Sequence, residues 1–377
     1  MFERILDCNN LGQSIFLFGA RQTGKSTLLK NKFKDAIFFD LLDSDLGNRL
    51  RRRPALLYET LKNKAADTLV IIDEIPEIPQ LLNEVHRLIS EKQLIFILCG
   101  SSARKLKRKG QNTLGGRAVP YYLYPLVSAE IPEFNLAKAL QDGMIPDHYK
   151  ARKPRQRLSA YIDVYLKEEI LQEALVRNLS HFERFLEVAA LTNGEMVNYN
   201  NVATDCGISA STVKEYFSIL QDTLIGYMVP AYAKTVKRAL IQAPRFYFFD
   251  VGVVNHLLHR NDLLPGTPEY GHAFEHFVIL EIIAFLSYHR KEERLSYWRT
   301  YNGAEVDAII GDKLAVEIKS ADEALPKHLK GLKAFGEEHP ECRRILVSAD
   351  RFNRKMGDIE CLYILDFLHA LWRGELV

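Results

Sequence analysis

Apolar runs alternate with polar and amphipathic stretches over the first hundred residues of the chain. Four of these runs read as strands and lie at residues 14–18, 36–40, 68–73 and 94–99. A continuous apolar run bounded by turn residues is typical of a strand that is covered on both faces. Residues 79–90 place Leu82, Val85 and Ile89 on one stripe, which predicts a helix. Strands that alternate with helices predict an α/β fold with a parallel sheet and helices on both faces.

A glycine-rich loop follows the first apolar run. Its residues are Gly19, Ala20, Arg21, Gln22, Thr23, Gly24, Lys25, Ser26 and Thr27. Strand, glycine loop and helix in this order are the pattern of a phosphate-binding P-loop, whose backbone N–H groups point at the β-phosphate. In such a loop Lys25 brings a positive charge to the β- and γ-phosphates, and Ser26 offers a hydroxyl ligand to Mg²⁺. The sequence therefore predicts a nucleoside triphosphate site, with ATP and Mg²⁺ as its ligands.

An acidic pair, Asp73 and Glu74, ends the third apolar run. Ligands of open α/β sheets bind at the carboxyl ends of the strands, so these two side chains are expected beside the P-loop. Asp73 is predicted to hold Mg²⁺ through its water shell. Glu74 is predicted to polarise the attacking water as a general base.

Four segments resemble a large family of bacterial and archaeal AAA-type ATPases that carry a C-terminal domain of unknown function. They read GARQTGKST, LVIIDEIPEIP, ILCGSSARKL and LGGRAVPYYLYPL. The resemblance implies that Ser101 or Ser102, at the tip of the fourth strand, senses the γ-phosphate. It also implies that Arg117 stabilises charge in the transition state, either within its own chain or across a subunit interface of a homo-oligomer.

The middle of the chain changes composition and then shows a helix-turn-helix pattern. Residues 141–157 are basic and contain Gly143, Pro146 and Pro154, which predicts a linker. Helices are expected at residues 158–177, 181–191, 200–206 and 210–221. The last two, with a turn at residues 207–209, predict a winged helix whose wing is formed by residues 224–231 and 243–249.

Basic side chains of this module are candidate DNA contacts. They are Lys214 on the second helix of the motif and Lys234, Lys237 and Arg238 in the wing. Since the second helix also carries Glu215 and Asp222, its positive face is sparse. The alternative is a winged helix that packs against a protein or against the ATPase core.

A hairpin near the C-terminus holds a second candidate chemistry. Residues 304–310 and 314–319 read as its strands, and Glu317 and Lys319 share a face because strand side chains alternate. The hairpin can bring Asp307 alongside them. Two carboxylates can share a divalent metal, and an adjacent lysine can position or deprotonate water for attack on a phosphodiester.

This pattern, after a helix that bears Glu275, is similar to the PD-(D/E)XK nuclease fold. The similarity assigns Asp307 and Glu317 to the metal, Lys319 to water activation and Glu275 to a supporting acidic position. Two alternatives stay open: the same fold used for binding without cleavage, and an unrelated charged hairpin at a sheet edge.

Composition bounds these predictions. A length of 377 residues is typical of about two or three domains. A net charge of +2 gives the protein no strong overall positive potential that would attract nucleic acid. Five scattered cysteines without a CxxC pair favour a reducing compartment and argue against a structural zinc. No apolar run approaches the roughly 18 residues of a membrane span, so no membrane partner is expected and the cytoplasm is the expected location.

These observations combine into one expected architecture. An AAA-type P-loop domain at residues 1–140 is followed by the linker at 141–157, a helical and winged-helix module at 158–250 and a nuclease-like α/β domain at 251–377. The expected function is a Mg²⁺-dependent ATPase whose cycle is coupled to DNA binding and to DNA cleavage by the C-terminal domain. The alternative is a slow NTP-driven regulatory switch whose C-terminal domain docks a protein partner and does not cleave.

Overall fold

The chain divides into two compact units in a computed structural model that describes residues 2–8, 12–101, 114–163, 165, 179–232 and 243–377. The N-terminal unit comprises Arg4–Pro125 and the short segment Asp222–Leu224. The C-terminal unit comprises Met1–Glu3, Leu126–Gln221 and Ile225–Val377. Each unit is described by itself.

The N-terminal unit is built on a five-stranded sheet in the order β2-β3-β4-β1-β5. All neighbouring strands pair in parallel. The strands are β1 (Ser14–Phe18), β2 (Ile37–Asp40), β3 (Leu69–Asp73), β4 (Ile95–Gly100) and β5 (Ala118–Tyr122). The four predicted strands are present with bounds shifted by at most one residue, and the predicted parallel sheet is confirmed.

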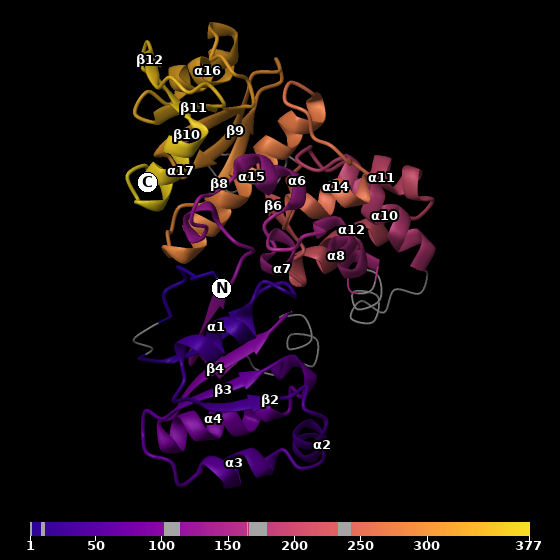
Figure 1. Ribbon diagram of the computed structural model, residues 1–377, viewed down its shortest axis with the longest axis vertical. Helices are drawn as coiled ribbons and strands as arrows, with labels where there is room; N and C mark the ends of the chain where they lie inside the picture. The colour runs from indigo at the N-terminus through magenta and orange to yellow at the C-terminus, as the bar shows by residue number, and fades with distance from the viewer. Residues whose placement is uncertain (1, 9–11, 102–113, 164, 166–178, 233–242) are drawn as a thin grey trace. The chain divides into compact units, whose positions relative to one another are not determined.

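Helices cover both faces of this sheet (Figure 1). They are α1 (Lys25–Lys32), α2 (Ser44–Arg52), α3 (Ala55–Leu61) and α4 (Leu81–Lys92), with short 3₁₀ turns η1 (Ile75–Glu77) and η2 (Leu114–Gly116). Buried side chains such as Phe16, Val70 and Leu98 pack with those of α2, α3 and α4 in one core, whereas α1 lies over the opposite face. Because the strands are parallel, the segments that follow β1, β3 and β4 leave the sheet at the same edge.

The first part of the C-terminal unit is mainly helical. Its elements are η3 (Ser128–Glu130), α6 (Leu136–Asp142), α7 (Pro146–Tyr149), α8 (Pro154–Ala160), α10 (Leu179–Leu191), α11 (Tyr199–Cys206), α12 (Ala210–Asp222), β6 (Gly226–Val229), β7 (Arg245–Phe248) and α14 (Val251–Leu257). The turn between α11 and α12 passes through Gly207, whose positive φ of 68° suits glycine. Strands β6 and β7 pair antiparallel, as expected for the wing. Lys234, Lys237 and Arg238 lie outside the described residues.

The segment predicted as a linker is part of the folded unit. The Asp250 side chain caps α14 and accepts a hydrogen bond from the backbone N–H of Met144 at 2.6 Å. A Cβ at Gly143 would collide with the Asp250 carboxylate, so only glycine fits this contact. Burial raises the pKa of Asp250 to about 6. Residues 143–144 are therefore held against α14, and the N-terminal unit ends at Pro125 rather than at the predicted residue 140.

The rest of the C-terminal unit is a six-stranded mixed sheet between helices, with strand order β12-β13-β11-β10-β9-β8. The strands are β8 (Leu295–Arg299), β9 (Glu305–Ile310), β10 (Leu314–Lys319), β11 (Arg343–Ser348), β12 (Arg354–Met356) and β13 (Ile359–Tyr363). Its helical elements are α15 (Pro268–Tyr288), η5 (Pro326–Leu329), α16 (Lys330–Glu338) and α17 (Ile364–Trp372). One face packs on α15 and α17, the other on α16.

The predicted hairpin is the pair β9 and β10, joined by a turn that contains Gly311 with φ 55°. Helix α15 precedes this hairpin and is 21 residues long. Among the residues that the structure describes, no helix combines the length and the hydropathy that crossing a bilayer requires.

Candidate functional site

The loop between β1 and α1 has the backbone shape of a phosphate cradle. Gly24 has φ 92° and caps the N-terminus of α1, while a Cβ at Gly19 would collide with the backbone carbonyl of Leu123. The Lys25 side chain is 5% exposed and its Nζ donates to the backbone oxygens of Gly19 at 2.7 Å and Ala20 at 3.1 Å. The lysine thus lies across the mouth of its own loop, bound to carbonyls that a phosphate can replace.

The predicted acids lie beside this loop. Asp73 is the last residue of β3, and its buried Oδ1 has no hydrogen-bond partner among the residues that the structure describes. Glu74 has left-handed backbone angles, φ 55° and ψ 46°, which are uncommon for a residue with a side chain. Burial raises the pKa of Glu74; the Lys25 ammonium acts against this rise, and the Asp73 carboxylate adds to it. Glu74 therefore lies within electrostatic reach of both Lys25 and Asp73.

Ser101 completes the group of predicted residues at this edge. It directly follows β4, which lies between β1 and β3 in the sheet, and its side chain is buried. Its backbone hydrogen bond to Glu74 lowers the pKa of that carboxyl. The other candidate sensor, Ser102, lies outside the described residues.

The residues at this edge fit a magnesium triphosphate. Loop amides and Lys25 suit the phosphates, while the Ser26 hydroxyl and the unpartnered oxygen of Asp73 are hard oxygen ligands of the kind Mg²⁺ prefers. An orphaned buried carboxylate oxygen is costly unless a ligand or water satisfies it. The unpartnered oxygen of Asp73 therefore supports the prediction that this residue binds a cation.

Arg117 lies at the opposite edge of the same sheet. It is exposed and directly precedes β5, whose first residue, Ala118, pairs with Ser14 at the start of β1. The P-loop begins at the other end of β1, and five residues of strand span about 16 Å. Arg117 is therefore separated from the phosphate cradle of its own chain by the length of a strand.

Arg4 contacts the cradle but is not among the residues predicted from the sequence. Its guanidinium donates to the backbone oxygens of Thr23, Tyr124 and Pro125, the last two at 2.7 and 3.2 Å. These bonds tie the P-loop to the segment after β5. No motif surrounds Arg4, so nothing in the sequence marks it.

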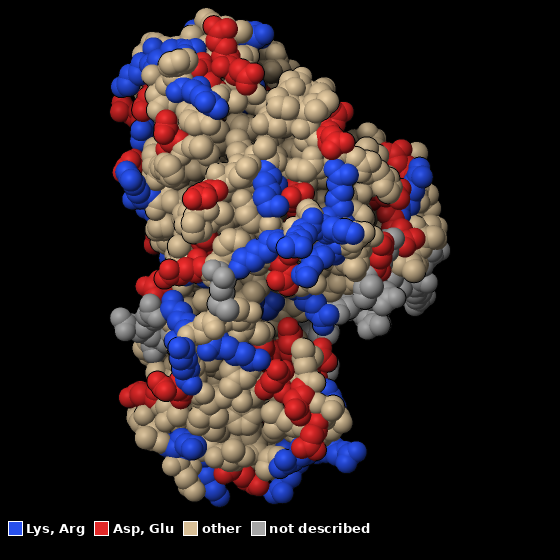
Figure 2. Space-filling model, in the orientation of Figure 1, with Lys and Arg blue, Asp and Glu red and all other residues tan. Residues whose placement is uncertain are grey.

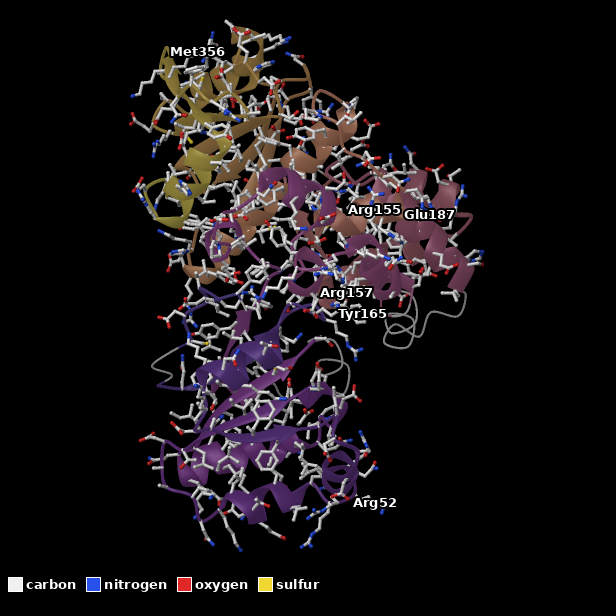
Figure 3. All side chains as sticks on the ribbon, in the orientation of Figure 1. Arg52, Arg155, Arg157, Tyr165, Glu187 and Met356 are labelled. Atoms are coloured by element: carbon white, nitrogen blue, oxygen red, sulfur yellow. The ribbon has the colours of Figure 1, made fainter. Side chains whose placement is uncertain are left out.

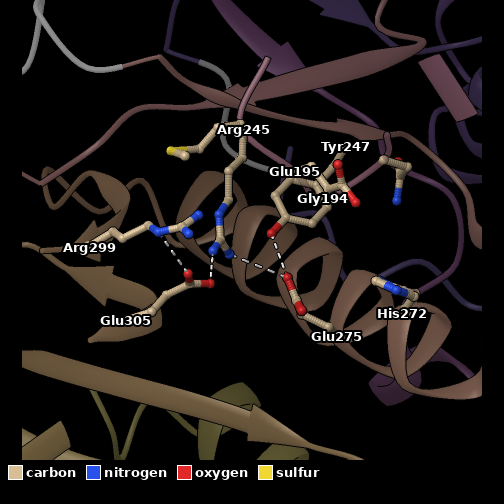
Figure 4. A pocket seen from close by; sticks show the side chains of 10 residues that line it. Gly194, Glu195, Arg245, Tyr247, His272, Glu275, Arg299 and Glu305 are labelled. Carbon is tan, nitrogen blue, oxygen red and sulfur yellow. Dashed lines mark hydrogen bonds and ion pairs between the residues drawn. The ribbon is translucent and has the colours of Figure 1, made fainter. Parts of the chain in front are cut away.

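The second predicted site forms a cluster of charges in the C-terminal unit. Figure 4 shows the part of this cluster around Glu275. The register of the hairpin brings Asp307 alongside Glu317 and Lys319. Asp307 Oδ2 accepts the backbone N–H of Ile318 at 2.9 Å and lies 3.4 Å from Lys319 Nζ. Lys319 Nζ is 2.7 Å from Glu317 Oε1.

Arg245, from β7, enters the same cluster. It is 4% exposed, with Nη1 3.5 Å from Glu275 Oε1 and 3.7 Å from Asp307 Oδ1, and Nη2 bonded to Glu305. Its guanidinium lies 4.6 Å from the centre of the Tyr297 ring. Neither Arg245 nor Glu305 is among the predicted site residues. The signal for Arg245 is an arginine inside the apolar run of residues 243–249, since a buried charge needs a partner.

The ionisation of this cluster follows from its burial. Burial raises the pKa of Glu275 and of Glu317, and the nearby Asp307 carboxylate raises both further. Burial opposes the charge on Lys319, but the Asp307 and Glu317 carboxylates outweigh it and raise the pKa of the lysine. Lys319 is therefore an ammonium at neutral pH, which donates hydrogen bonds and cannot accept a proton from water.

A divalent metal does not fit the nuclease-like residues in this arrangement. Of the four carboxylate oxygens of Asp307 and Glu317, three already face Arg245, Lys319 or the Ile318 N–H. The fourth, Glu317 Oε2, is buried and has no hydrogen-bond partner in the described part of the chain. Magnesium takes about six oxygen ligands. Within the described residues, no group of three or more acidic, histidine or cysteine side chains is arranged to hold a metal.

Basic side chains of the helical part are exposed. Lys214 lies on α12, with Nζ 5.4 Å from the centre of the Tyr199 ring, at a cavity of about 470 Å³. Lysine and arginine side chains also gather around α8 (Figure 2), where Arg155 and Arg157 are exposed (Figure 3). Arg155 is 3.4 Å from Asp262, so part of this charge is compensated locally.

Three family models match successive parts of the chain. Residues 12–132 match an AAA domain, residues 133–264 a domain of unknown function (DUF8612) and residues 270–367 another domain of unknown function (DUF4143). The strand order, P-loop and strand-end acids described above all lie within the part of the chain that matches the AAA domain. None of the curated proteins matches the chain significantly.

Solved structures match the chain at low similarity. The Aeropyrum pernix ORC1 protein, solved in complex with DNA, is 12% identical over 66% of this chain and 87% of its own, with a TM-score of 0.25. A signal transduction ATPase with numerous domains from Pyrococcus horikoshii, which has a tetratricopeptide repeat sensor, is 12% identical over 73% of this chain and 45% of its own, with a TM-score of 0.20.

Proposed function

We propose that this protein is a Mg²⁺-dependent ATPase. The observation that carries the proposal is the topology: the loop with Lys25, the acids Asp73 and Glu74, and Ser101 follow the neighbouring parallel strands β1, β3 and β4 at one edge of the sheet. Phosphoryl transfer to water needs mainly positioning and electrostatic stabilisation, and these residues supply both.

Each residue has a distinct task in the proposed reaction. Lys25 exchanges its two backbone carbonyl partners for phosphate oxygens, so nucleotide binding replaces bonds that already exist. Ser26 and Asp73 would hold Mg²⁺, and this ion would neutralise charge on the phosphates. Glu74, whose pKa burial raises, accepts the proton of the attacking water, because a base works best when its pKa approaches the working pH. Ser101 links the γ-phosphate to Glu74 through its backbone.

Arg117 is proposed to act on the site of a neighbouring copy. Its place at the amino-terminal edge of the sheet keeps it from its own phosphates. A homo-oligomer that brings this edge to the P-loop of the next subunit would complete the site. Mixing a Lys25→Ala chain with an Arg117→Ala chain checks this: each is inactive alone, and mixed oligomers regain part of the turnover.

We further propose that the ATPase cycle controls DNA binding by the C-terminal unit. The α11–α12 pair with the β6–β7 ribbon has the element order of a winged helix, and Lys214 is exposed on its second helix. The remaining candidates are Lys234, Lys237 and Arg238. Contacts of lysine with phosphate would make binding fall steeply with salt.

ATP turnover with and without DNA tests this function. Wild-type protein should hydrolyse ATP faster when DNA is present, and Lys25→Ala should lose nucleotide affinity. Ordinary ATP binding by Lys25→Ala would remove the phosphate-cradle assignment.

A second candidate function is a slow nucleotide-driven switch whose C-terminal unit docks a protein and does not cleave. The specific observation in its favour is the occupation of the acidic cluster by Arg245 and Lys319. Plasmid nicking in Mg²⁺ or Mn²⁺ separates the two: nicking that Asp307→Ala abolishes supports a nuclease built on Asp307, Glu317 and Lys319. Absence of nicking and of DNA stimulation, with a stable partner in a pull-down, supports the switch.

A further inference from the structure

The cavity beside Lys214 has the size and the lining of a ligand site. Its volume is about 470 Å³, within the range of about 300–1,000 Å³ that is typical of small-molecule sites. Residues 196–200, which lead into α11, line it together with Ala210 and Lys214 of α12 and with Ala243 before β7. No lining residue is an acid, so a group with negative charge meets no like charge there.

Tyr199, the first residue of α11, contributes an aromatic ring to this cavity. The ring is half-buried and makes an edge-to-face contact with Phe217, with ring centres 6.0 Å apart. Phe217 is 1% exposed, so this contact holds the tyrosine ring against the core. A fixed aromatic ring in a cavity is the kind of group on which an unstacked nucleobase packs.

Lys214 supplies a positive charge next to this ring. Its Nζ lies 5.4 Å from the centre of the Tyr199 ring, and no carboxylate of a described residue lies within ion-pair distance of it. Its charge is therefore available to a phosphate. A base that stacks on Tyr199 replaces the contact between the ring and the ammonium, and the released ammonium can reach the phosphate of the same nucleotide.

Two exposed asparagines, Asn198 and Asn200, add amide groups to the lining. The Asn198 Oδ1 accepts hydrogen bonds from the backbone N–H groups of Asn200 and Asn201, both at 3.1 Å. The amide nitrogen of Asn198 is left to donate. Amide groups can bond to the Watson–Crick edge of a base, and that edge is free only where the base is unpaired.

The exposed face of α12 gives little support to the binding of a paired duplex. Lys214 is followed directly by the exposed Glu215, and the other exposed residues of this helix are Ser211, Ser218 and Gln221. A helix that enters the major groove lies between two phosphate backbones. One cation beside one anion adds little attraction to them.

We propose that this cavity binds an unpaired base of a DNA strand, with Tyr199 as the stacking surface and Lys214 as the contact to the phosphate. The proposal rests on the DNA binding proposed above and narrows it to DNA that contains unpaired nucleotides. Because every base has an aromatic face, stacking on Tyr199 selects the unpaired state and not a sequence.

DNA binding by the full wild-type chain tests this proposal. Three fluorescein-labelled probes share one sequence: a single DNA strand of about 20 nucleotides, longer than a typical single-strand site, the fully paired duplex, and the same strand as RNA. Fluorescence anisotropy at one salt concentration gives each Kd, with and without Mg²⁺ and a non-hydrolysable ATP analogue, because the proposed cycle controls DNA binding. The single DNA strand should bind at least about tenfold more tightly than the duplex.

Substitutions in the cavity sharpen the test. Tyr199→Leu keeps an apolar side chain against Phe217 but removes the aromatic face, and it should weaken single-strand binding about tenfold, whereas Tyr199→Phe should bind like the wild type. Lys214→Gln should make the slope of log Kd against log salt shallower by about 0.7, the loss of one phosphate contact on a single strand. Tyr301→Leu, which removes a fully exposed tyrosine between β8 and β9, is the matched control and should change nothing.

Two results would overturn this inference and leave DNA binding in place. One is a wild-type chain that binds the duplex as tightly as the single strand, and this result needs no variant that has to fold. The other is a folded Tyr199→Leu chain with wild-type affinity for the single strand. RNA bound more tightly than the DNA strand would overturn the choice of DNA. Binding of none of the three probes would overturn the proposed DNA function, and this inference with it.

Discussion

The nucleotide site and the acidic cluster use the same residue types and leave them in opposite conditions. Both contain a lysine and a pair of acids: Asp73 and Glu74 stand at the end of β3, whereas Asp307 and Glu317 lie within β9 and β10. In the N-terminal unit, Lys25 donates to two loop carbonyls, and Asp73 keeps an oxygen without a partner among the described residues. In the cluster, Lys319 and Arg245 lie within ion-pair distance of the carboxylates. The charges of the nucleotide site are therefore available to a ligand, whereas those of the acidic cluster are already paired with one another.

The contrast shows that a motif does not fix the state of its charges. Residue types and spacing are equally favourable in both places. The difference comes from Arg245, which lies on a separate element, together with Lys319, which is within ion-pair distance of both Asp307 and Glu317. A buried charge that is partnered gives up its capacity to bind, and a buried charge that is left unpartnered lowers stability until its ligand arrives.

The largest expected effect concerns Glu74. Glu74→Gln should lower ATP turnover about a thousandfold, within the range that loss of a general base produces, while ATP still binds. The control is Glu77→Gln, an exposed acid three residues further on, which should turn over like the wild type. If Glu74→Gln kept more than roughly a tenth of the wild-type turnover, Glu74 would not be a general base. The nucleotide site and the acidic cluster would then not differ in the way described above.

The next effect concerns the stability of the cluster. Arg245→Met leaves Glu275 and Asp307 without their cation and should lower the free energy of unfolding by roughly 3–5 kcal/mol. Arg299→Met touches the same Glu305 from the solvent side and should cost less than about 1 kcal/mol. Urea denaturation of the two variants measures both values. If both variants lost the same free energy of unfolding, the ion pairs of Arg245 would contribute no more to stability than the exposed ion pair of Arg299.

The smallest effect concerns pH and Glu281. This carboxylate of α15 is fully buried, accepts from Ser128 and from Trp372 Nε1, and burial raises its pKa from 4.5 to about 7. The folded state therefore keeps a proton that the unfolded chain releases above pH 4.5. The contribution of Glu281 to stability falls as pH rises from about 4.5 to 7 and is constant above that.

Glu281→Gln cannot lose a proton, so its stability relative to wild type should rise across this pH range by up to roughly 3 kcal/mol. His148 and His276, whose pKa values burial lowers to about 4, titrate in both proteins and cancel in the difference. Exposed Glu133→Gln is the control. A flat difference for Glu281→Gln would show that its charge is already compensated, as in the Arg245 cluster.

The nucleotide site is readable from the sequence because its parts are local. The strand, loop and helix around residues 14–32 fix the P-loop geometry within one short segment. Asp73 and Glu74 are placed by the end of a buried strand, and a parallel sheet brings strand ends together. The order of β4 between β1 and β3 follows from tertiary pairing, yet Ser101 could be predicted because the resemblance supplied that position.

The state of the second cluster is not readable in this way. Arg245 meets Glu275 and Glu305 across 30 and 60 residues of sequence. The sequence marks a charge inside an apolar strand, but not which of many carboxylates it pairs with. The unit boundary at Pro125 could not be predicted either, because the composition of the sequence does not change there. Asp250 and Met144, whose contact holds the segment after this boundary in the C-terminal unit, are more than a hundred residues apart in the sequence.

The left-handed backbone of Glu74 also affects the stability of the protein. A residue with a Cβ loses roughly 1–2 kcal/mol in that conformation, and glycine does not. Glu74→Gly should consequently raise the free energy of unfolding and abolish the proposed ATP hydrolysis. Screening this chain for heat resistance alone would therefore select against turnover at this position.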